Sequence, residues 1–286
     1  MSQITFIGTG EAFDPALPNT SILYEGCFNI LLDCGYSVPH AFWRISQDPS
    51  FLDGIYLSHI HADHSFGLPA LLLWMRLAGR QKTLRVFGGP GVESWLPEIL
   101  NLGYPGSFSP DKCFPIEAVP IRPGTPHRWG ELTIRNAQST HSVRNLSIRI
   151  DSAHSSVCYS GDGSPSEATR SLFHGADILI HECYSDRVQG PNHAAAEVLI
   201  PMAENLEVHA LYLLHLGTQE KAAIHSRVSL WRGTPPVYLP APGESFPVAE
   251  RLHSRREHCE KSKKNVSKSS PSDPWKYAAI LACDSM

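Results

Sequence analysis

The segment His59-Ile60-His61-Ala62-Asp63-His64 decides the fold of this chain. Four of its six side chains can bind a metal ion, and they follow an apolar stretch, residues 54–58, that predicts a buried strand. In an extended or loop backbone His59 and His61 project to one side, and a turn after them sends Asp63 and His64 to another. One such loop serves two ions, whereas a helical H-E-x-x-H motif grips one ion from one face. A solvated histidine-rich turn explains any single histidine, but it explains the whole pattern poorly.

The composition is that of a globular protein without a membrane span. The chain has 286 residues, of which 42% are hydrophobic and 18% are charged, so we expect one large domain or two small ones. The longest apolar run, residues 68–74, contains Pro69 and is too short to cross a bilayer, so no membrane partner is expected. A net charge of −4 argues against strong, charge-driven nucleic-acid binding by the whole chain, although it leaves room for a local basic patch.

The cysteines predict a reducing compartment. Seven of them are scattered along the chain and form no C-x-x-C pair. The first residues enter a strand at once and leave no room for an export signal. An odd cysteine count in such a chain indicates reduced thiols and a cytoplasmic location.

Strand and helix signals alternate in two similar halves. Strands are expected at residues 4–8, 21–24, 28–32, 54–58, 84–87, 113–120, 131–136, 147–150, 157–160, 178–180 and 210–214. Helices are expected at residues 38–44, 69–77, 92–100, 166–173 and 194–204. Segments 113–120 and 131–136 are expected to form antiparallel strands. Helices that cover a sheet in each half give an α/β protein, a four-layer αββα sandwich with two sheets packed face to face.

The sandwich is expected to occupy residues 1–245. From there the sequence becomes polar and basic and includes a Ser/Pro-rich linker, so residues 246–286 are expected to form a largely flexible tail. A basic run of this kind is more often a solvated tail than an element that grips RNA. Residues 275–282 are apolar enough to dock on the folded domain, so the end of the tail is not necessarily flexible.

More candidate ligands lie where loops leave the predicted strands. They are Asp33, His141, Asp162 and His215. Taken singly, each has a structural explanation as a turn aspartate or as a histidine at a sheet edge. Their joint placement at strand ends, after the histidine-rich loop, favours a metal site.

In this order the residues match the five motifs of the metallo-β-lactamase superfamily, and the chain most resembles the ribonuclease Z branch. The resemblance covers about residues 1–245 and rests on three further motifs: Phe6-Ile7-Gly8-Thr9-Gly10, Tyr159-Ser160-Gly161-Asp162, and Ile180-His181-Glu182-Cys183, which is similar to the branch's H-E-A-T motif. The glycine pair is not a dinucleotide fingerprint, because Phe13 stands where G-x-G-x-x-G requires glycine.

The resemblance implies a dinuclear metal centre. Its ligands would be His59, His61 and His141 for the first ion, Asp63, His64 and His215 for the second, and Asp162 as the bridge. Asp33 would orient the histidine-rich loop from outside the ligand set. Nitrogen and carboxylate ligands suit two divalent ions, Zn(II) first, with Mn(II) or Fe as alternatives.

The chemistry implied is hydrolysis by a metal-bridging hydroxide, with Asp63 accepting a proton from the bridging water. Glu182 and His193 match the pair that protonates the leaving group in ribonuclease Z-like enzymes. His193-Ala194-Ala195 stands where those enzymes have H-S-T, so a second interpretation stays open in which His193 caps a helix starting at Ala194.

The resemblance therefore implies a metal-dependent phosphodiesterase related to ribonuclease Z. Only 21 positions separate His141 from Asp162, too few for the arm with which ribonuclease Z grips tRNA. This favours a small or cyclic phosphodiester over RNA as the substrate and places authentic tRNA 3′ processing second. Thioester or lactone hydrolysis is another alternative, and a binding protein with a degenerate site is the third. A homodimer is expected by family analogy alone.

Overall fold

A computed structural model describes residues 2–248, which form two seven-stranded sheets. The first sheet contains, in spatial order, β14 (Ser245–Val248), β1 (Ser2–Gly8), β2 (Ser21–Glu25), β3 (Asn29–Leu32), β4 (Gly54–Tyr56), β5 (Leu84–Gly88) and β6 (Ile116–Pro120). The second contains β13 (Val237–Tyr238), β12 (Leu211–Leu214), β11 (Ile178–Glu182), β10 (Ser156–Tyr159), β9 (Leu146–Asp151), β8 (Leu132–Gln138) and β7 (His127–Trp129).

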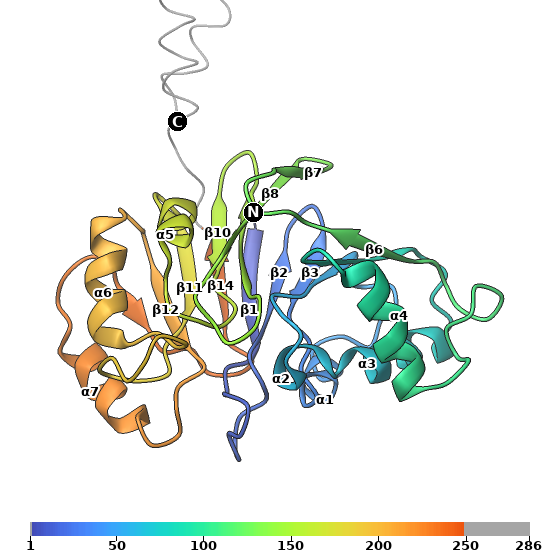
Figure 1. Ribbon diagram of the computed structural model, residues 1–286, viewed down its shortest axis with the longest axis horizontal. Coiled ribbons are helices and arrows are strands. Elements are labelled where there is room, and N and C mark those ends of the chain that lie inside the picture. Colours follow the sequence, from blue (N-terminus) through green and yellow to red (C-terminus); the bar gives the residue numbers. More distant parts are fainter. Residues whose placement is uncertain (1, 249–286) are drawn as a thin grey trace, which may run out of the picture. The chain divides into compact units, whose positions relative to one another are not determined.

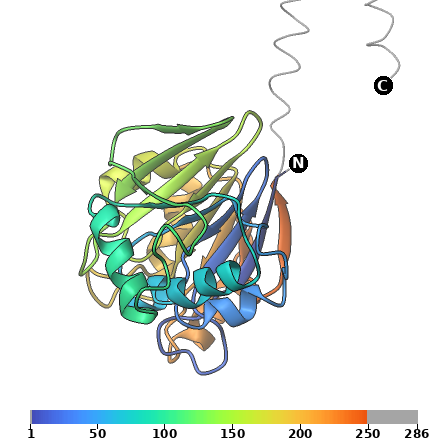
Figure 2. The same cartoon turned by 90° about the vertical axis from the view of Figure 1, so that its right-hand side faces the viewer.

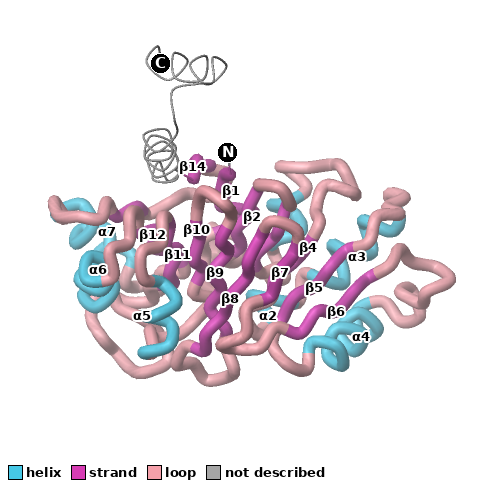
Figure 3. Tube along the Cα trace, turned by 90° about the horizontal axis from the view of Figure 1, so that it is seen from above, coloured by secondary structure: helices cyan, strands magenta, loops and turns pink. Residues whose placement is uncertain are grey.

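Helices cover the outer face of each sheet. On the first sheet lie α1 (Val38–Phe42), α2 (Ala62–Ser65), α3 (Leu68–Leu77) and α4 (Val92–Gly103). On the second lie α5 (Glu167–Phe173), α6 (Ala196–Asn205) and α7 (Lys221–Leu230). Figure 1 shows the two groups of helices on opposite sides of the strands, and Figure 2 shows the first group in front of its sheet. Seen from above, in Figure 3, the strands lie between the helices. The predicted αββα sandwich is confirmed.

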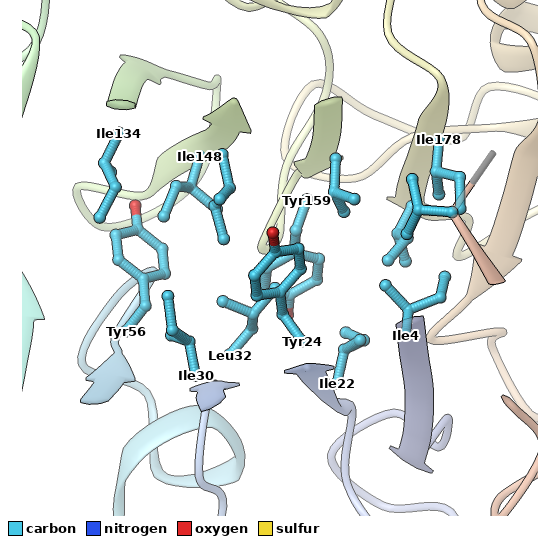
Figure 4. Close-up of a cluster of buried hydrophobic side chains, with 14 of the residues drawn as sticks. Ile4, Ile22, Tyr24, Ile30, Leu32, Tyr56, Ile134, Ile148, Tyr159 and Ile178 are labelled. Carbon is cyan, nitrogen blue, oxygen red and sulfur yellow. The ribbon is translucent and has the colours of Figure 1, made fainter. Parts of the chain in front are cut away.

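Three apolar clusters hold these layers together. One lies between the sheets, where Ile30 and Tyr56 of the first sheet face Ile148 and Tyr159 of the second (Figure 4). The other two lie between each sheet and its helices. Successive side chains of a strand point to opposite faces, and here both faces are buried, so the strands are apolar without interruption. Each fully buried large aliphatic side chain stabilises the fold by about 1.5–3 kcal/mol.

One expected pairing is wrong. Strand β6 does not pair with β8; it runs parallel to β5 at the edge of the first sheet. Strand β8 instead pairs antiparallel with β7 and β9 in the second sheet. The reason is the two-residue turn Gly130-Glu131, since Trp129 and Leu132 are register partners and Gly130 adopts φ +55°. This tight hairpin gives β8 a local partner that the sequence analysis missed.

The first sheet continues past the expected domain boundary. Residues 246–248, assigned above to the tail, belong to β14 and pair with β1. The rest of that tail, residues 249–286, lies outside the described residues. Within residues 2–248 no helix combines the length and apolarity that crossing a membrane requires.

The topology brings several loops to one edge of the sandwich. Strands β3, β4 and β5 run parallel in the first sheet, and β10, β11 and β12 run parallel in the second. The carboxyl ends of parallel strands meet at one edge of a sheet, where open α/β sheets place their ligands. In Figure 1, α2 and the long loop between β1 and β2 lie together at the lower edge.

Candidate metal centre

The histidine-rich loop directs its four candidate ligands into two groups. It follows β4, and His61, the N-cap of α2, has an extended backbone with φ −59° and ψ +150°. Asp63 and His64 then lie on the helical turn of α2. The change from extended to helical backbone sends the two pairs of side chains in different directions.

All seven predicted ligands come together in two clusters at this edge. One consists of His59, His61 and His141, and the other of Asp63, His64, Asp162 and His215, with the candidate ligand atoms of each cluster within 4.8 Å of one another. The clusters adjoin at Asp162, whose Oδ2 is 4.0 Å from His59 Nε2 and 3.5 Å from His215 Nε2.

The spacing of the ligand atoms fits a tetrahedral cation. Bonds of about 2.0–2.2 Å at tetrahedral angles place neighbouring ligand atoms about 3.4 Å apart. His64 Nε2 lies 3.2 Å from Asp63 Oδ2 and 3.3 Å from Asp162 Oδ1. His141 Nε2 lies 3.3 Å from His61 Nδ1. Both clusters therefore have the spread of ligand atoms around one ion.

Three of these atoms are buried without a hydrogen-bond partner among the described residues. They are His59 Nε2, His64 Nε2 and Asp162 Oδ1. An unsatisfied buried polar atom costs about 1–3 kcal/mol, so several converging on one point need a partner of another kind. A divalent cation satisfies imidazole nitrogens and carboxylate oxygens together. The residues present fit a pair of metal ions.

In His141 and His215 a hydrogen bond holds the proton on the nitrogen that faces away from the cluster. His141 Nδ1 lies 2.9 Å from the carbonyl oxygen of Asn192 and must donate to it, so in the neutral ring Nε2 carries no proton. Thr20 Oγ1 donates to the carbonyl oxygen of Gly10 and therefore accepts from His215 Nδ1, 3.2 Å away. Both rings thus present a lone pair to the cluster, as metal ligands require.

Asp33 orients the imidazole rings of His59 and His64 through hydrogen bonds. Its Oδ2 accepts from His64 Nδ1 at 2.8 Å and from Ser58 Oγ at 2.7 Å. Because the Ser58 hydroxyl gives its proton to Asp33, it accepts from His59 Nδ1, 3.0 Å away. Asp33, expected to orient the loop from outside the ligand set, lies in the position for that role.

Backbone strain also marks this edge. Asp33 and His215 adopt left-handed φ values of +61° and +58°. Such a conformation costs a non-glycine residue about 1–2 kcal/mol and persists where the surroundings determine it, often at functional sites. Asp33 is fixed further by its backbone N–H, which donates to Tyr56, and by its carbonyl, which accepts from Ser21.

The two carboxylates of the second cluster lie among imidazoles that favour their ionised forms. Burial alone would raise the pKa of Asp162, but the rings of His215 and His64 hold it well below its usual range. Burial acts in the same way on Asp63, whose pKa the neighbouring His64 lowers to about 2. Both carboxylates are therefore ionised at neutral pH. In the first cluster burial lowers the pKa of His59 well below its ordinary value, so that ring is neutral.

A glycine and an asparagine fix the bridging carboxylate. Gly161 has φ +60°, and a Cβ there would lie 2.3 Å from Asn145 Oδ1. Asn145 is fully buried; its Nδ2 donates to the carbonyl of Ser160, and its Oδ1 accepts from the N–H of Asp162. Asn145 and Thr20 were not predicted from the sequence, because neither residue type carries a metal-site signal of its own.

Glu182 and His193 lie beside the clusters. Glu182 is fully buried, and its Oε1 is 3.2 Å from His193 Nδ1. Burial opposes charge on His193, but the bond to Glu182 prevails and raises the pKa of the ring. A ring nitrogen of His193 lies within 4.8 Å of ligand atoms of His141 and Asp162. The capping alternative is wrong, because α6 begins at Ala196 and Ala195 is its N-cap.

A cavity of about 240 Å³ opens beside the first cluster. Its walls come from the loop of His59, from the loop after His141, and from the start of α4. Its lining is mainly apolar and includes Val92, Trp95, Val143 and Leu146, with Arg144 as the charged side chain. The Arg144 guanidinium donates to the carbonyl of Pro90 and so joins two walls.

Comparison with known proteins gives one family match and several relatives. The family described as anti-Pycsar protein Apyc1 matches residues 2–229. The ribonuclease Z of Methanothermobacter thermautotrophicus is 26% identical over 305 residues, which cover 87% of this chain and 94% of that enzyme.

Two solved structures share the architecture. The metallo-β-lactamase fold protein YhfI from Bacillus subtilis has a TM-score of 0.72 and 22% identity and covers 86% of this chain and 98% of its own. The short form of human tRNase Z has a TM-score of 0.68 and 20% identity over 86% of this chain and 99% of its own. The predicted metallo-β-lactamase fold and the ribonuclease Z-like relationship are confirmed, and with the histidine and aspartate clusters they indicate a metal-dependent hydrolase.

Proposed function

This chain belongs to the family of the anti-Pycsar protein Apyc1, and on that premise we propose that it is a dinuclear metal phosphodiesterase acting on small or cyclic phosphodiesters. The observation that carries the proposal is the convergence of seven ligating side chains into two clusters that adjoin at Asp162. A degenerate site would have lost some of these side chains. None is missing here, so a pure binding role explains the chain less well.

The proposed ligands follow the two clusters. His59, His61 and His141 would hold one ion, Asp63, His64 and His215 would hold the other, and Asp162 would be shared by both. Imidazole and carboxylate donors in tetrahedral spacing favour Zn(II), with Mn(II) and Fe as alternatives. When bound, the two ions supply an activated water molecule and Lewis acidity toward the phosphoryl oxygens.

The protein's own residues handle the protons. Asp63 is ionised at neutral pH and lies at the cluster, so it accepts a proton from the attacking water. His193 is held by Glu182 with a raised pKa and keeps a proton available for the leaving alkoxide. Glu182 itself is fixed by the backbone N–H groups of Gly163, Ala194 and Tyr184.

The proposed substrate is small. The interval between His141 and Asp162 is occupied by β9 and β10, which leaves no place in it for a tRNA-gripping arm. The cavity beside the first cluster has room for one organic substituent of a phosphodiester, and its apolar lining around Trp95 suits a flat ring. RNA is the second candidate, favoured by the relationship to ribonuclease Z.

The first test is hydrolysis of bis(p-nitrophenyl) phosphate by metal-loaded protein, by chelated protein and by chelated protein reloaded with Zn(II). We expect activity in the loaded and reloaded samples only. A precursor tRNA assayed in parallel distinguishes the RNA candidate, which requires cleavage at its 3′ end. Metal-replete protein that hydrolyses no phosphodiester would contradict the proposal.

A Glu182→Gln variant separates phosphodiester from thioester or lactone hydrolysis. The substitution removes the carboxylate that raises the pKa of His193, and loss of that ring as a proton donor lowers the rate by about 10²–10⁴-fold where the leaving group is an alkoxide. We expect this loss with a cyclic phosphodiester and a much smaller one with p-nitrophenolate, which leaves without protonation. Thioester or lactone cleavage needs no such acid, so an activity that survives the substitution on those substrates would favour them.

We also propose a cytoplasmic location. The five cysteines among the described residues are free, and burial raises the pKa of the Cys158 thiol to about 12, so that thiol is unreactive. A homodimer rests on family analogy and is tested by the molar mass of the protein in solution.

A further inference from the structure

Tyr159 connects the two sheets at the metal centre. It is the last residue of β10 and is fully buried, and its Oη donates to Asp33 Oδ2 at 2.7 Å. Asp33 follows β3 in the opposite sheet. Figure 4 shows Tyr159 in the apolar layer between the sheets, where a hydroxyl is retained only with a partner.

The hydroxyl of Tyr159 completes the hydrogen bonds of the Asp33 carboxylate. Asp33 Oδ2 accepts from Tyr159 Oη, Ser58 Oγ and His64 Nδ1 at 2.7, 2.7 and 2.8 Å, and Oδ1 accepts from the Ser58 N–H at 2.7 Å. These four hydrogen bonds, three of them to Oδ2, hold the carboxylate in one orientation.

The Asp33 carboxylate orients one imidazole ring in each cluster. His64, bonded directly to Asp33, is a ligand candidate of the second cluster. Ser58, held by Asp33, accepts from His59 of the first cluster. One side chain therefore sets the orientation of one imidazole on each side of the centre.

We propose that Tyr159 is a positioning residue of the metal centre, which acts through Asp33 to orient His59 and His64 for two ions. The proposal rests on the proposed function, because it assumes that the clusters bind metal. It adds a role for the tyrosine of the Tyr159-Ser160-Gly161-Asp162 motif, from which the resemblance used only the aspartate.

Tyr56 provides a matched control. It is also fully buried in the same layer, and its Oη donates across the sheets to the carbonyl of Leu146 at 2.6 Å (Figure 4). Its hydroxyl bonds to no side chain of the metal centre. A merely structural role for Tyr159 predicts that loss of either hydroxyl has the same consequences.

The experiment compares Tyr159→Phe with Tyr56→Phe in the full chain. Zn(II) affinity is measured by competition with a chromogenic chelator, and folding by thermal denaturation of the metal-free proteins. We expect both variants to lose similar thermal stability. We expect the Zn(II) affinity to fall by about 10–100-fold in Tyr159→Phe, the usual effect of losing a partner that orients metal ligands, and to stay within about twofold in Tyr56→Phe.

A rescue variant tests whether the hydrogen bond itself matters. 4-Aminophenylalanine at position 159 keeps an N–H donor at the end of the ring, so it should restore most of the Zn(II) affinity. If Tyr159→Phe does not fold, this variant decides the question, since a loss of affinity with the donor retained contradicts the proposal.

The outcomes separate this inference from the proposed function. Wild-type protein that binds two ions, together with equal affinities for the two Phe variants, overturns the role of Tyr159 and leaves the function intact. Wild-type protein that binds less than one ion per chain removes the proposed function, and the inference falls with it. A selective loss in Tyr159→Phe with rescue supports both.

Discussion

The two ligand clusters differ in charge and in access to solvent, although one six-residue loop serves both. His59, His61 and His141 are all imidazoles, and two of them are only half-buried. The second cluster is buried throughout and contains two carboxylates, Asp63 and Asp162. A dinuclear centre built in this way has one open side and one closed side.

The charge difference has a consequence for binding. Asp63 and Asp162 are both ionised at neutral pH, because neighbouring imidazoles keep their pKa values low. Charge attraction in a buried site is less screened than at the surface. We therefore expect the second cluster to hold its ion more tightly, and the first cluster, beside the cavity, to exchange its ion and face the substrate.

We expect the largest effect from a substitution of Asp162, the residue at which the clusters adjoin. Asp162→Ala removes one carboxylate that belongs to the second cluster and is also the carboxylate nearest to the first cluster. Both ions should therefore be lost. Metal-ion catalysis contributes several kcal/mol, so phosphodiesterase activity should fall by at least about 10³-fold. Metal content by mass spectrometry and turnover of bis(p-nitrophenyl) phosphate measure the two effects.

Asp177→Ala is the matched control for this substitution. Asp177 is a buried aspartate that directly precedes β11 and accepts a hydrogen bond from the Ser156 N–H, at the end of the strand opposite to Glu182. Its loss should lower stability and leave two ions per chain. Retention of both ions by Asp162→Ala would show that the clusters are independent.

Single-histidine variants should then separate the two clusters. In His215→Ala the second cluster loses one of its two imidazoles, and we expect activity to fall by about 10³-fold, since several kcal/mol depend on a complete pair of ions. In His141→Ala we expect one tightly held ion to remain and the loss to be about tenfold smaller. Activity and metal content of the two purified variants provide the measurement, and equal losses would contradict the assigned asymmetry.

Sequence alone picked out side chains that the structure brings together in two clusters, because their residue types are chemically distinctive and stand at strand ends. His59, His141, Asp162 and His215 each end or follow an apolar run, and periodicity locates such runs well. The orienting residues Thr20 and Asn145 have no comparable signal, since serine, threonine and asparagine are common in every loop. Their roles arise only when distant segments pack together.

Most strands and helices of the fold were also predictable from the sequence, but some elements and pairings were not. Long apolar strands and amphipathic helices were found, but α7 was missed because Ile224 is its one fully buried residue, which leaves no apolar stripe. The sheet to which β6 and β8 belong was also beyond local reasoning, since both read as half-buried strands. The Gly130-Glu131 turn carried that information in its hairpin geometry.

The order of metal release gives a third way to sharpen the comparison. Wild-type protein mixed with an excess of chelator should release its ions in two phases, with rates at least about tenfold apart, which corresponds to about 1.4 kcal/mol of barrier difference. The fast phase should come from the first cluster, because His61 and His141 are accessible. His141→Ala should lack the fast phase only, and a single phase in wild-type protein would contradict the difference in access.

The smallest expected effect concerns how each cluster orients its outer rings. His141 is held by a backbone carbonyl, that of Asn192, whereas His215 is held by the hydroxyl of Thr20, which is almost fully buried. Only the second arrangement can be removed by substitution. Thr20→Val keeps the volume and leaves His215 Nδ1 without an acceptor, so the slow phase of release should become about tenfold faster while the fast phase stays unchanged.

Thr5→Val is the control for this last change. Thr5 is a buried threonine of β1 whose hydroxyl bonds to Glu25 and Ser245, away from the metal centre. It should lose a similar side-chain hydrogen bond without altering either phase. If Thr20→Val accelerates both phases equally, the orientation of His215 affects metal release from both clusters. The two clusters then do not release their ions independently, which contradicts the proposed difference between them.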